Sequence, residues 1–241
     1  MKEVLYTIPL NDALNEDGEC LFCSISKNVE QDILDFVLGS GSSYMEYDVR
    51  MQTDEEGFCA PHFKKMFEYG NTLGNAWILK THYMRINEQL KNEIKRFRPA
   101  KSSLFKNKDE ENTMVEWINK KEESCYICKR FNETYDRYIA TFFHMYKTES
   151  DFIDRISQSK GYCLTHFKDI CKNADKYLSK KELDEFYPVV FKLMEENMER
   201  LQEDVNWLVE KFDYKNKDAD WKNSKDAVQR GMQKLKGGIY G

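Results

Sequence analysis

A seven-residue motif, Gly-aromatic-Cys-x-x-His-Phe, occurs twice in this chain, as GFCAPHF at residues 57–63 and as GYCLTHF at residues 161–167. A Cys-x-x-Cys pair precedes each copy: Cys20 with Cys23, and Cys125 with Cys128. The second set is displaced from the first by 105 residues at the Cys-x-x-Cys pair and by 104 at the Cys-x-x-His pair. Two groups that keep the same order and nearly the same spacing indicate an internal duplication.

Taken in order along the chain, each copy supplies three cysteines and one histidine. The predicted ligands are Cys20, Cys23, Cys59 and His62 for the first site and Cys125, Cys128, Cys163 and His166 for the second. Three thiolates and one imidazole form a complete tetrahedral shell for Zn²⁺. A single Cys-x-x-Cys pair would be weak support for a metal, but four ligands in the same order twice are strong support. We therefore expect two Zn²⁺ ions, one in each repeat.

Each ligand pair stands at the start of a segment with helical periodicity. Residues three apart lie on one face of a helix, so both members of a pair can reach a common centre. The free N–H groups and the positive end of the dipole at a helix N-terminus stabilise thiolates there. Gly57 and Gly161, two residues before the cysteine, are predicted to form the turn into the helix, and Pro61 suits its first turn.

Other roles for these cysteines compete with zinc binding. Disulfides are disfavoured because the total of seven is odd and no signal-peptide pattern is present. A thioredoxin-like redox pair is disfavoured because no β-α-β pattern surrounds either Cys-x-x-Cys. Two iron–sulfur clusters are the open alternative, since three cysteines and one histidine can hold a cluster and ligand type alone does not distinguish it from zinc.

The composition predicts an all-α fold, because Pro and Gly are few and Glu, Lys, Leu, Met and aromatic residues are plentiful. We expect two repeated helical units, at residues 1–100 and 101–213, followed by a C-terminal helix and tail at residues 214–241. Each unit ends in a long helix, and the second carries the apolar stripe Val190, Met194, Met198, Leu201, Val205, Leu208 and Phe212. Such a stripe favours packing between the halves or a homodimer formed through the long helices.

Composition also limits the partners. A net charge of −5 disfavours nucleic-acid binding, and the Lys-rich segments at 91–108 and near the C-terminus are interpreted as a solvated linker and a solvated tail. No apolar run is long enough to span a membrane and no export signal is visible, so we expect a cytoplasmic protein. His82, His144 and Cys171 are expected to be packing residues. No catalytic residue is identified.

The doubled motif resembles a family of uncharacterised cytoplasmic proteins from anaerobic Gram-positive bacteria, grouped as a domain of unknown function. The resemblance extends from about Leu5 to about Phe212. It is carried by Cys20, Cys23, Gly57, Cys59, His62 and Phe63, and by Cys125, Cys128, Gly161, Cys163, His166 and Phe167. No activity is implied by it.

The leading hypothesis is a non-enzymatic protein with two structural zinc ions that presents a surface or cleft to a protein or small-molecule partner, because four protein ligands leave no open position on the metal. The alternative is an iron–sulfur redox protein or enzyme of anaerobic metabolism. A metal sensor or thiol-based redox switch is a third hypothesis.

Overall fold

The structure is a computed structural model that describes residues 4–98 and 112–238. Within these ranges the chain forms eleven α-helices and two short 3-10 helices, with no strand, which confirms the predicted all-α class. None of the helices in the described ranges combines the length and the apolar character needed to cross a membrane.

The chain divides into two compact units that do not follow its linear order. The terminal unit consists of residues 1–29 and 134–241, and the central unit of residues 30–133. Two continuous helices, α2 (Leu21–Leu38) and α7 (Tyr126–Thr148), contribute residues to both. The predicted boundary between residues 100 and 101 lies outside the described residues.

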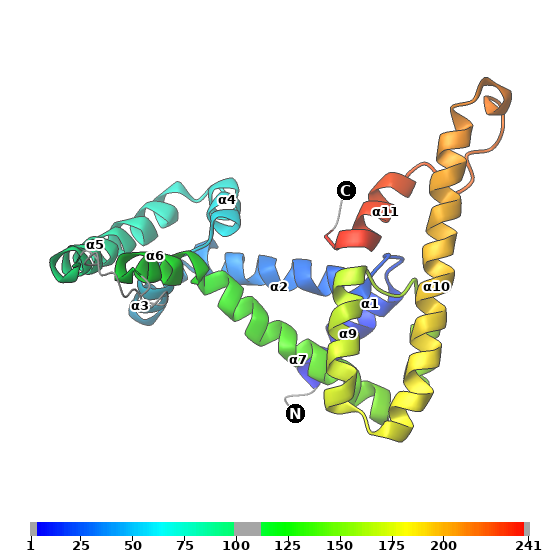
Figure 1. Cartoon of the computed structure of the whole chain (residues 1–241), viewed down its shortest axis with the longest axis horizontal. Coiled ribbons are helices and arrows are strands. Elements are labelled where there is room, and N and C mark those ends of the chain that lie inside the picture. The colour runs from blue at the N-terminus through cyan, green and yellow to red at the C-terminus, as the bar shows by residue number, and fades with distance from the viewer. Residues whose placement is uncertain (1–3, 99–111, 239–241) are drawn as a thin grey trace, which may run out of the picture. The chain divides into compact units, whose positions relative to one another are not determined.

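The terminal unit is built from helices at both ends of the sequence (Figure 1). Besides parts of α2 and α7 it contains α1 (Val4–Asn15), α8 (Phe152–Ser157), α9 (Leu164–Tyr177), α10 (Lys180–Lys211), η2 (Tyr214–Asn216) and α11 (Ala227–Lys236). The long helix α10 packs against α11 and α8, and α11 also packs against α9. The C-terminal helix is therefore part of the folded unit rather than an appendage.

Aromatic side chains form the core of the terminal unit. Six of them are at most 1% exposed: Phe22, Phe142, Phe143, Phe152, Tyr162 and Phe186. The ring centroid of Phe142 lies 5.2–6.5 Å from the other five. Each such ring removes a large apolar area from water. Since Phe22 follows Cys20 by two residues and Tyr162 precedes Cys163, this core also fixes the backbone beside two predicted ligands.

The central unit contains the rest of α2, η1 (Ser43–Met45), α3 (Tyr47–Glu56), α4 (Ala60–Glu68), α5 (Thr72–Arg96), α6 (Thr113–Glu123) and the first turns of α7. The buried rings of Phe58 and Tyr126 have their centroids 6.2 Å apart, and each precedes or follows a predicted ligand by one residue. The side chain of Asn71 caps α5 by accepting a hydrogen bond from the Gly74 amide. Both units thus place buried aromatic rings next to ligand cysteines.

Apolar periodicity predicted the long helices correctly but predicted their buried faces only in part. In α10, Val190, Met194 and Leu201 are buried, whereas Phe212 at the end of the stripe is 81% exposed. In α5, Ile78 is fully buried and Ile94 is 59% exposed. A stripe marks a face of a helix, but the sequence does not say where along it a neighbour is packed.

The start of α10 carries a capping box, in which the Ser179 hydroxyl accepts from the Glu182 amide and the Glu182 carboxylate accepts from the Ser179 amide. We expect Ser179→Ala to lower the free energy of unfolding by about 1 kcal/mol, because an amide at the helix start loses its acceptor. Urea unfolding followed by circular dichroism measures this. Ser179→Asn keeps an acceptor and serves as the control, and an unchanged midpoint for Ser179→Ala would contradict the prediction.

Candidate metal centres

The four ligand pairs stand at helix N-termini, as predicted. Cys59 and Cys163 are the N-cap residues of α4 and α9, and Cys20 and Cys125 immediately precede α2 and α7. The second ligand of each pair lies three residues further on, in the first helical turn. Backbone amides donate to sulfur there: His166 N lies 3.4 Å from Cys163 Sγ, and Cys128 N lies 3.5 Å from Cys125 Sγ. These bonds use amides that have no partner inside the helix.

The two motif glycines make the turns into α4 and α9 with positive φ angles, 61° at Gly57 and 75° at Gly161. A side chain would also be obstructed at Gly57, where a Cβ would stand 2.8 Å from the ring of His82. The Gly57 carbonyl oxygen accepts a hydrogen bond from the Tyr126 amide at 2.9 Å. This bond joins the turn before Cys59 to the start of α7, next to Cys125.

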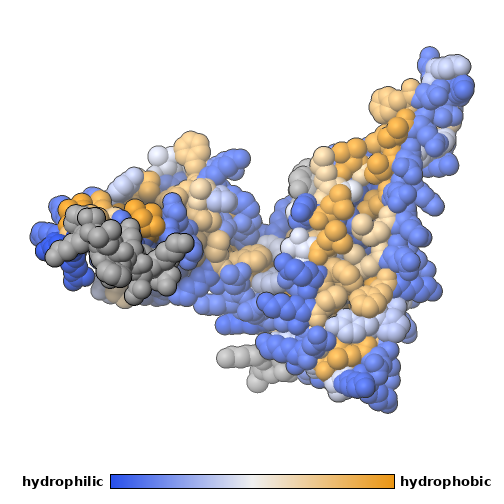
Figure 2. Space-filling view, viewed as in Figure 1, coloured by the Kyte–Doolittle hydropathy of each residue, from blue (hydrophilic) through white to orange (hydrophobic). Residues whose placement is uncertain are grey.

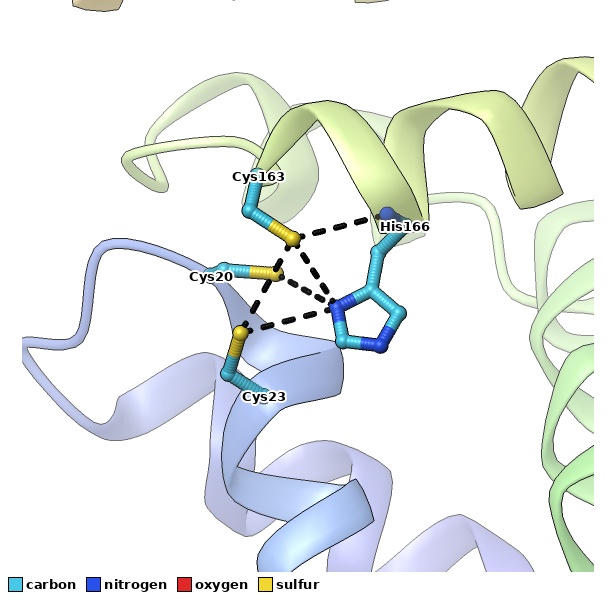
Figure 3. A group of neighbouring side chains, drawn as sticks. All are labelled: Cys20, Cys23, Cys163 and His166. Carbon is cyan, nitrogen blue, oxygen red and sulfur yellow. Dashed lines mark hydrogen bonds between the residues drawn. The ribbon is translucent and has the colours of Figure 1, made fainter. Parts of the chain in front are cut away.

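Centre A consists of Cys20, Cys23, Cys163 and His166, all in the terminal unit (Figure 3). His166 Nδ1 lies 3.3 Å from Cys20 Sγ, 3.5 Å from Cys23 Sγ and 3.2 Å from Cys163 Sγ. The Sγ atoms of Cys23 and Cys163 are 3.9 Å apart. All four side chains are buried, and Cys20 and Cys163 are fully inaccessible to solvent.

Centre B consists of Cys59, His62, Cys125 and Cys128, all in the central unit. His62 Nδ1 lies 3.1 Å from Cys59 Sγ, 3.2 Å from Cys125 Sγ and 3.4 Å from Cys128 Sγ. The Sγ atoms of Cys59 and Cys128 are 3.8 Å apart. The geometry resembles that of centre A, but Cys59 and Cys128 are only half-buried.

The grouping of the ligands corrects the prediction made from their order in the sequence. Each centre combines the Cys-x-x-Cys pair of one motif copy with the Cys-x-x-His pair of the other, so Cys20 and Cys23 do not meet Cys59 and His62. Helix length explains this. The 18 residues of α2 extend for about 27 Å, so the chain that follows α2 begins that far along the helix from the Cys20 and Cys23 pair.

The ligand spacing fits one metal ion in each centre. All four ligand atoms lie within 4.8 Å of one another in both groups. Two sulfurs bound tetrahedrally at 2.3 Å from a common ion stand about 3.8 Å apart, and the measured separations are 3.8 and 3.9 Å. Both histidines present Nδ1 to the sulfurs, which leaves Nε2 free for another partner.

The pKa values of the side chains in the two groups reflect burial and the hydrogen bonds between ligands. Hydrogen bonds with Cys125 and Glu30 raise the pKa of His62 to about 10. Burial opposes the charge on His166, but hydrogen bonds with Cys163 and Cys23 outweigh it and raise its pKa to about 9. Burial raises the pKa of the Cys20 thiol. A metal cation that binds in either group would displace protons, because the ligand forms are thiolate and neutral imidazole.

The two ligand histidines differ in the group that contacts Nε2, the ring nitrogen that faces away from the sulfurs. His62 Nε2 lies 2.9 Å from a carboxylate oxygen of Glu30, which also pairs with Lys65. The hydrogen bond from His62 lowers the pKa of Glu30. His166 Nε2 lies 3.3 Å from the Ser26 hydroxyl, and its ring centroid is 5.8 Å from that of Tyr135. Such outer partners fix the orientation of ligand histidines.

Sequence reasoning missed these outer partners, although the repeat contained a signal for two of them. Glu30 and Tyr135 each stand ten residues after the first cysteine of their copy, and each touches the histidine of that same copy. His82 and His144 belong to neither group, and His82 Nδ1 bonds to the Asp54 carbonyl oxygen. Cys171 is half-buried and is also outside both groups.

These observations define an all-α protein with two candidate metal centres, each formed by three cysteines and one histidine. The chain belongs to the DUF6062 family, described as a family of unknown function, whose model matches residues 1–241. No curated protein and no solved structure gives a significant match.

The exchanged grouping can be tested with two double variants that each remove two cysteines. We expect Cys59→Ala/Cys125→Ala to keep one bound metal per chain, because both residues belong to centre B. Cys20→Ala/Cys59→Ala should keep none, because it leaves both centres with three ligands. Elemental analysis of the purified variants measures this. Grouping within each motif copy would give the reverse pattern.

Proposed function

We propose that this protein holds two structural Zn²⁺ ions, in centres A and B, and acts as a non-enzymatic binding protein. The observation that carries the proposal is that four protein ligand atoms converge at each centre. A tetrahedral ion with four protein ligands has no position left for water or substrate, whereas catalytic zinc keeps one open. The zinc ions would then serve to join helices and leave binding to the protein surface.

The ligand spacing favours zinc over the iron–sulfur alternative. In a cluster, each protein ligand binds an iron at a different place around the cluster, so the ligand atoms are more widely separated than around one ion. One pair of sulfurs in each group, Cys23 with Cys163 and Cys59 with Cys128, stands 3.9 and 3.8 Å apart, close to the tetrahedral value. We also infer a cytoplasmic location, because a reducing compartment keeps thiols available and all seven cysteines are free.

Protein purified without oxygen and without added metal should be colourless and contain two zinc ions per chain. Each structural zinc site contributes on the order of 10–16 kcal/mol of folding free energy. We therefore expect a strong chelator to abolish most of the helical signal in circular dichroism, and added Zn²⁺ to restore it. Brown protein with iron and acid-labile sulfide would overturn the proposal in favour of the cluster alternative.

An apolar groove in the terminal unit supports a binding role. It has a volume of about 300 Å³ between α10 and α11, and its apolar lining includes Met198, Leu201, Val205 and Leu235. Along α11, Val228, Met232 and Leu235 are 48–53% exposed. Figure 2 shows apolar surface gathered over this region of α10 and α11. Exposed apolar side chains grouped in this way mark an interaction surface.

We propose a second copy of this chain as the partner of that surface, because the charges beside the groove complement each other. Exposed carboxylates lie along the same stretch of α10, at Glu195, Glu196, Glu199 and Glu203, and Glu199 lines the groove. Exposed lysines lie on and before α11: Lys222, Lys225 and Lys236. In a two-fold symmetric pair, α11 of one copy faces α10 of the other, so acidic and basic flanks meet.

The wild-type protein should therefore be a dimer in light scattering coupled to size-exclusion chromatography. Met232→Glu should shift it to the monomer without loss of zinc, because a charge enters the apolar contact. Val115→Glu is the control, since Val115 on α6 is 50% exposed and belongs to the central unit. A wild-type protein that is monomeric across a dilution series would contradict the dimer.

A further inference from the structure

The segment that follows α11 lies directly against centre A. Gly237 is buried, with φ at 80°, a backbone conformation that favours glycine. A Cβ at Gly237 would stand 3.4 Å from Cys163 Sγ and 3.8 Å from Cys23 Sγ. The Lys236 carbonyl oxygen accepts a hydrogen bond from the Thr165 hydroxyl, one residue before His166. The C-terminal segment thus covers two ligand sulfurs of centre A.

Lys234 in α11 is buried beside the same centre. It is 1% exposed, and its ammonium donates to the Glu19 carbonyl oxygen at 3.0 Å and to the Lys160 carbonyl oxygen. This contradicts the sequence-based interpretation of the C-terminal lysines as a solvated tail. Removing an ammonium from water is costly unless a negative charge compensates it.

The nearest carboxylate is only a partial counterion for Lys234. Glu19, itself 2% exposed, lies 3.7 Å from the Lys234 ammonium, but it is closer to Arg200 and Arg230, at 2.5 and 3.3 Å. Asp204 also pairs with Arg230, at 2.9 Å. Lys234 therefore shares one carboxylate with two arginines and has none of its own among the described residues.

Zinc in centre A would supply the missing negative charge. One Zn²⁺ with three thiolates and a neutral imidazole has a net charge of −1, and Cys20 directly follows Glu19 in the sequence. Burial lowers the pKa of Lys234, whereas the charges of Glu19 and Cys20 act in the opposite direction. A buried cation and an anionic metal centre stabilise each other in a medium of low dielectric constant.

We propose that α11 and Gly237 are an integral part of centre A, with Lys234 as a positioning residue whose ammonium balances the charge of the zinc-bound centre. This inference rests on the proposed function, because it requires zinc in centre A. The segment covers the sulfurs, so zinc in centre A is retained more strongly than zinc in centre B, where Cys59 and Cys128 are half-buried. Docking of α11 in turn depends on zinc in centre A.

The experiment uses the full-length, zinc-loaded protein and a chromogenic chelator at increasing concentration. We expect wild-type protein to release one zinc from centre B first and the second from centre A at much higher chelator concentration. Lys234→Met keeps the apolar part of the side chain and removes the charge. It should weaken zinc retention in centre A by about 10–100-fold, as is typical for loss of an outer partner of a metal site.

Four comparisons make this result specific. Lys236→Met removes an exposed lysine from the same helix and should leave both releases unchanged. Centre B is the internal control in each variant that keeps its ligands, and Cys59→Ala/Cys125→Ala, which lacks centre B, identifies the release from centre A. Thr165→Val removes only the hydrogen bond to the backbone carbonyl of Lys236 and should weaken zinc retention in centre A by about 2–10-fold. It provides a milder test if Lys234→Met does not fold.

Hydrogen exchange gives a readout that is independent of the chelator. Amides of α11 should be protected with zinc in both centres and exchange rapidly when centre A alone is emptied by Cys20→Ala/Cys163→Ala. Unchanged zinc retention in both Lys234→Met and Thr165→Val, or full protection of α11 with centre A empty, would overturn the inference even though the wild-type chain binds two zinc ions. A wild-type chain that binds no zinc would instead overturn the proposed function.

Discussion

The structure depends on the placement of ligand pairs at the N-termini of four helices. At these positions a cysteine sulfur can accept a backbone amide hydrogen that the helix does not use, as at Cys163 and Cys125. The same placement gathers three sulfurs into a small volume, where several thiolates would repel one another unless a cation lay between them. A helix N-terminus therefore stabilises each thiolate by itself, whereas a metal ion stabilises the ligands as a group. Buried aromatic rings beside Cys20, Cys125 and Cys163 hold the backbone in that arrangement.

Much of this arrangement can be read from the sequence, because the information is local. Ligand type, the spacing of three and the turn glycines place all eight side chains at helix starts. Which pairs meet is not local information, because Cys20 and Cys125 each open a Cys-x-x-Cys pair at a helix start and either pair could join either Cys-x-x-His pair. Helix length decides the question, and it favours the exchanged arrangement. Lys234 was missed for a related reason, since nothing in a Lys-rich segment distinguishes the one lysine that is buried.

Two centres with the same ligands have different surroundings. Centre A is enclosed by the aromatic core of the terminal unit and by the segment after α11, whereas two cysteines of centre B remain partly open to solvent. The outward nitrogen of one histidine meets a carboxylate and that of the other meets a hydroxyl. The ligand set specifies the chemistry of a centre, but the exchange of its metal and its coupling to the rest of the fold are determined by the residues around it.

The exchanged grouping also determines the order in which the centres can assemble on the ribosome. The ligands of centre B span residues 59–128 and lie wholly within the span of centre A, residues 20–166. During synthesis, Cys20 and Cys23 emerge first, but more than half of the chain must be made before Cys163 and His166 follow. The ligands of centre B are complete earlier. In the meantime the only Cys-x-x-His pair available to them is the wrong one, at Cys59 and His62. A metal ion captured before Cys163 and His166 emerge would therefore join two pairs that lie in different centres of the folded chain.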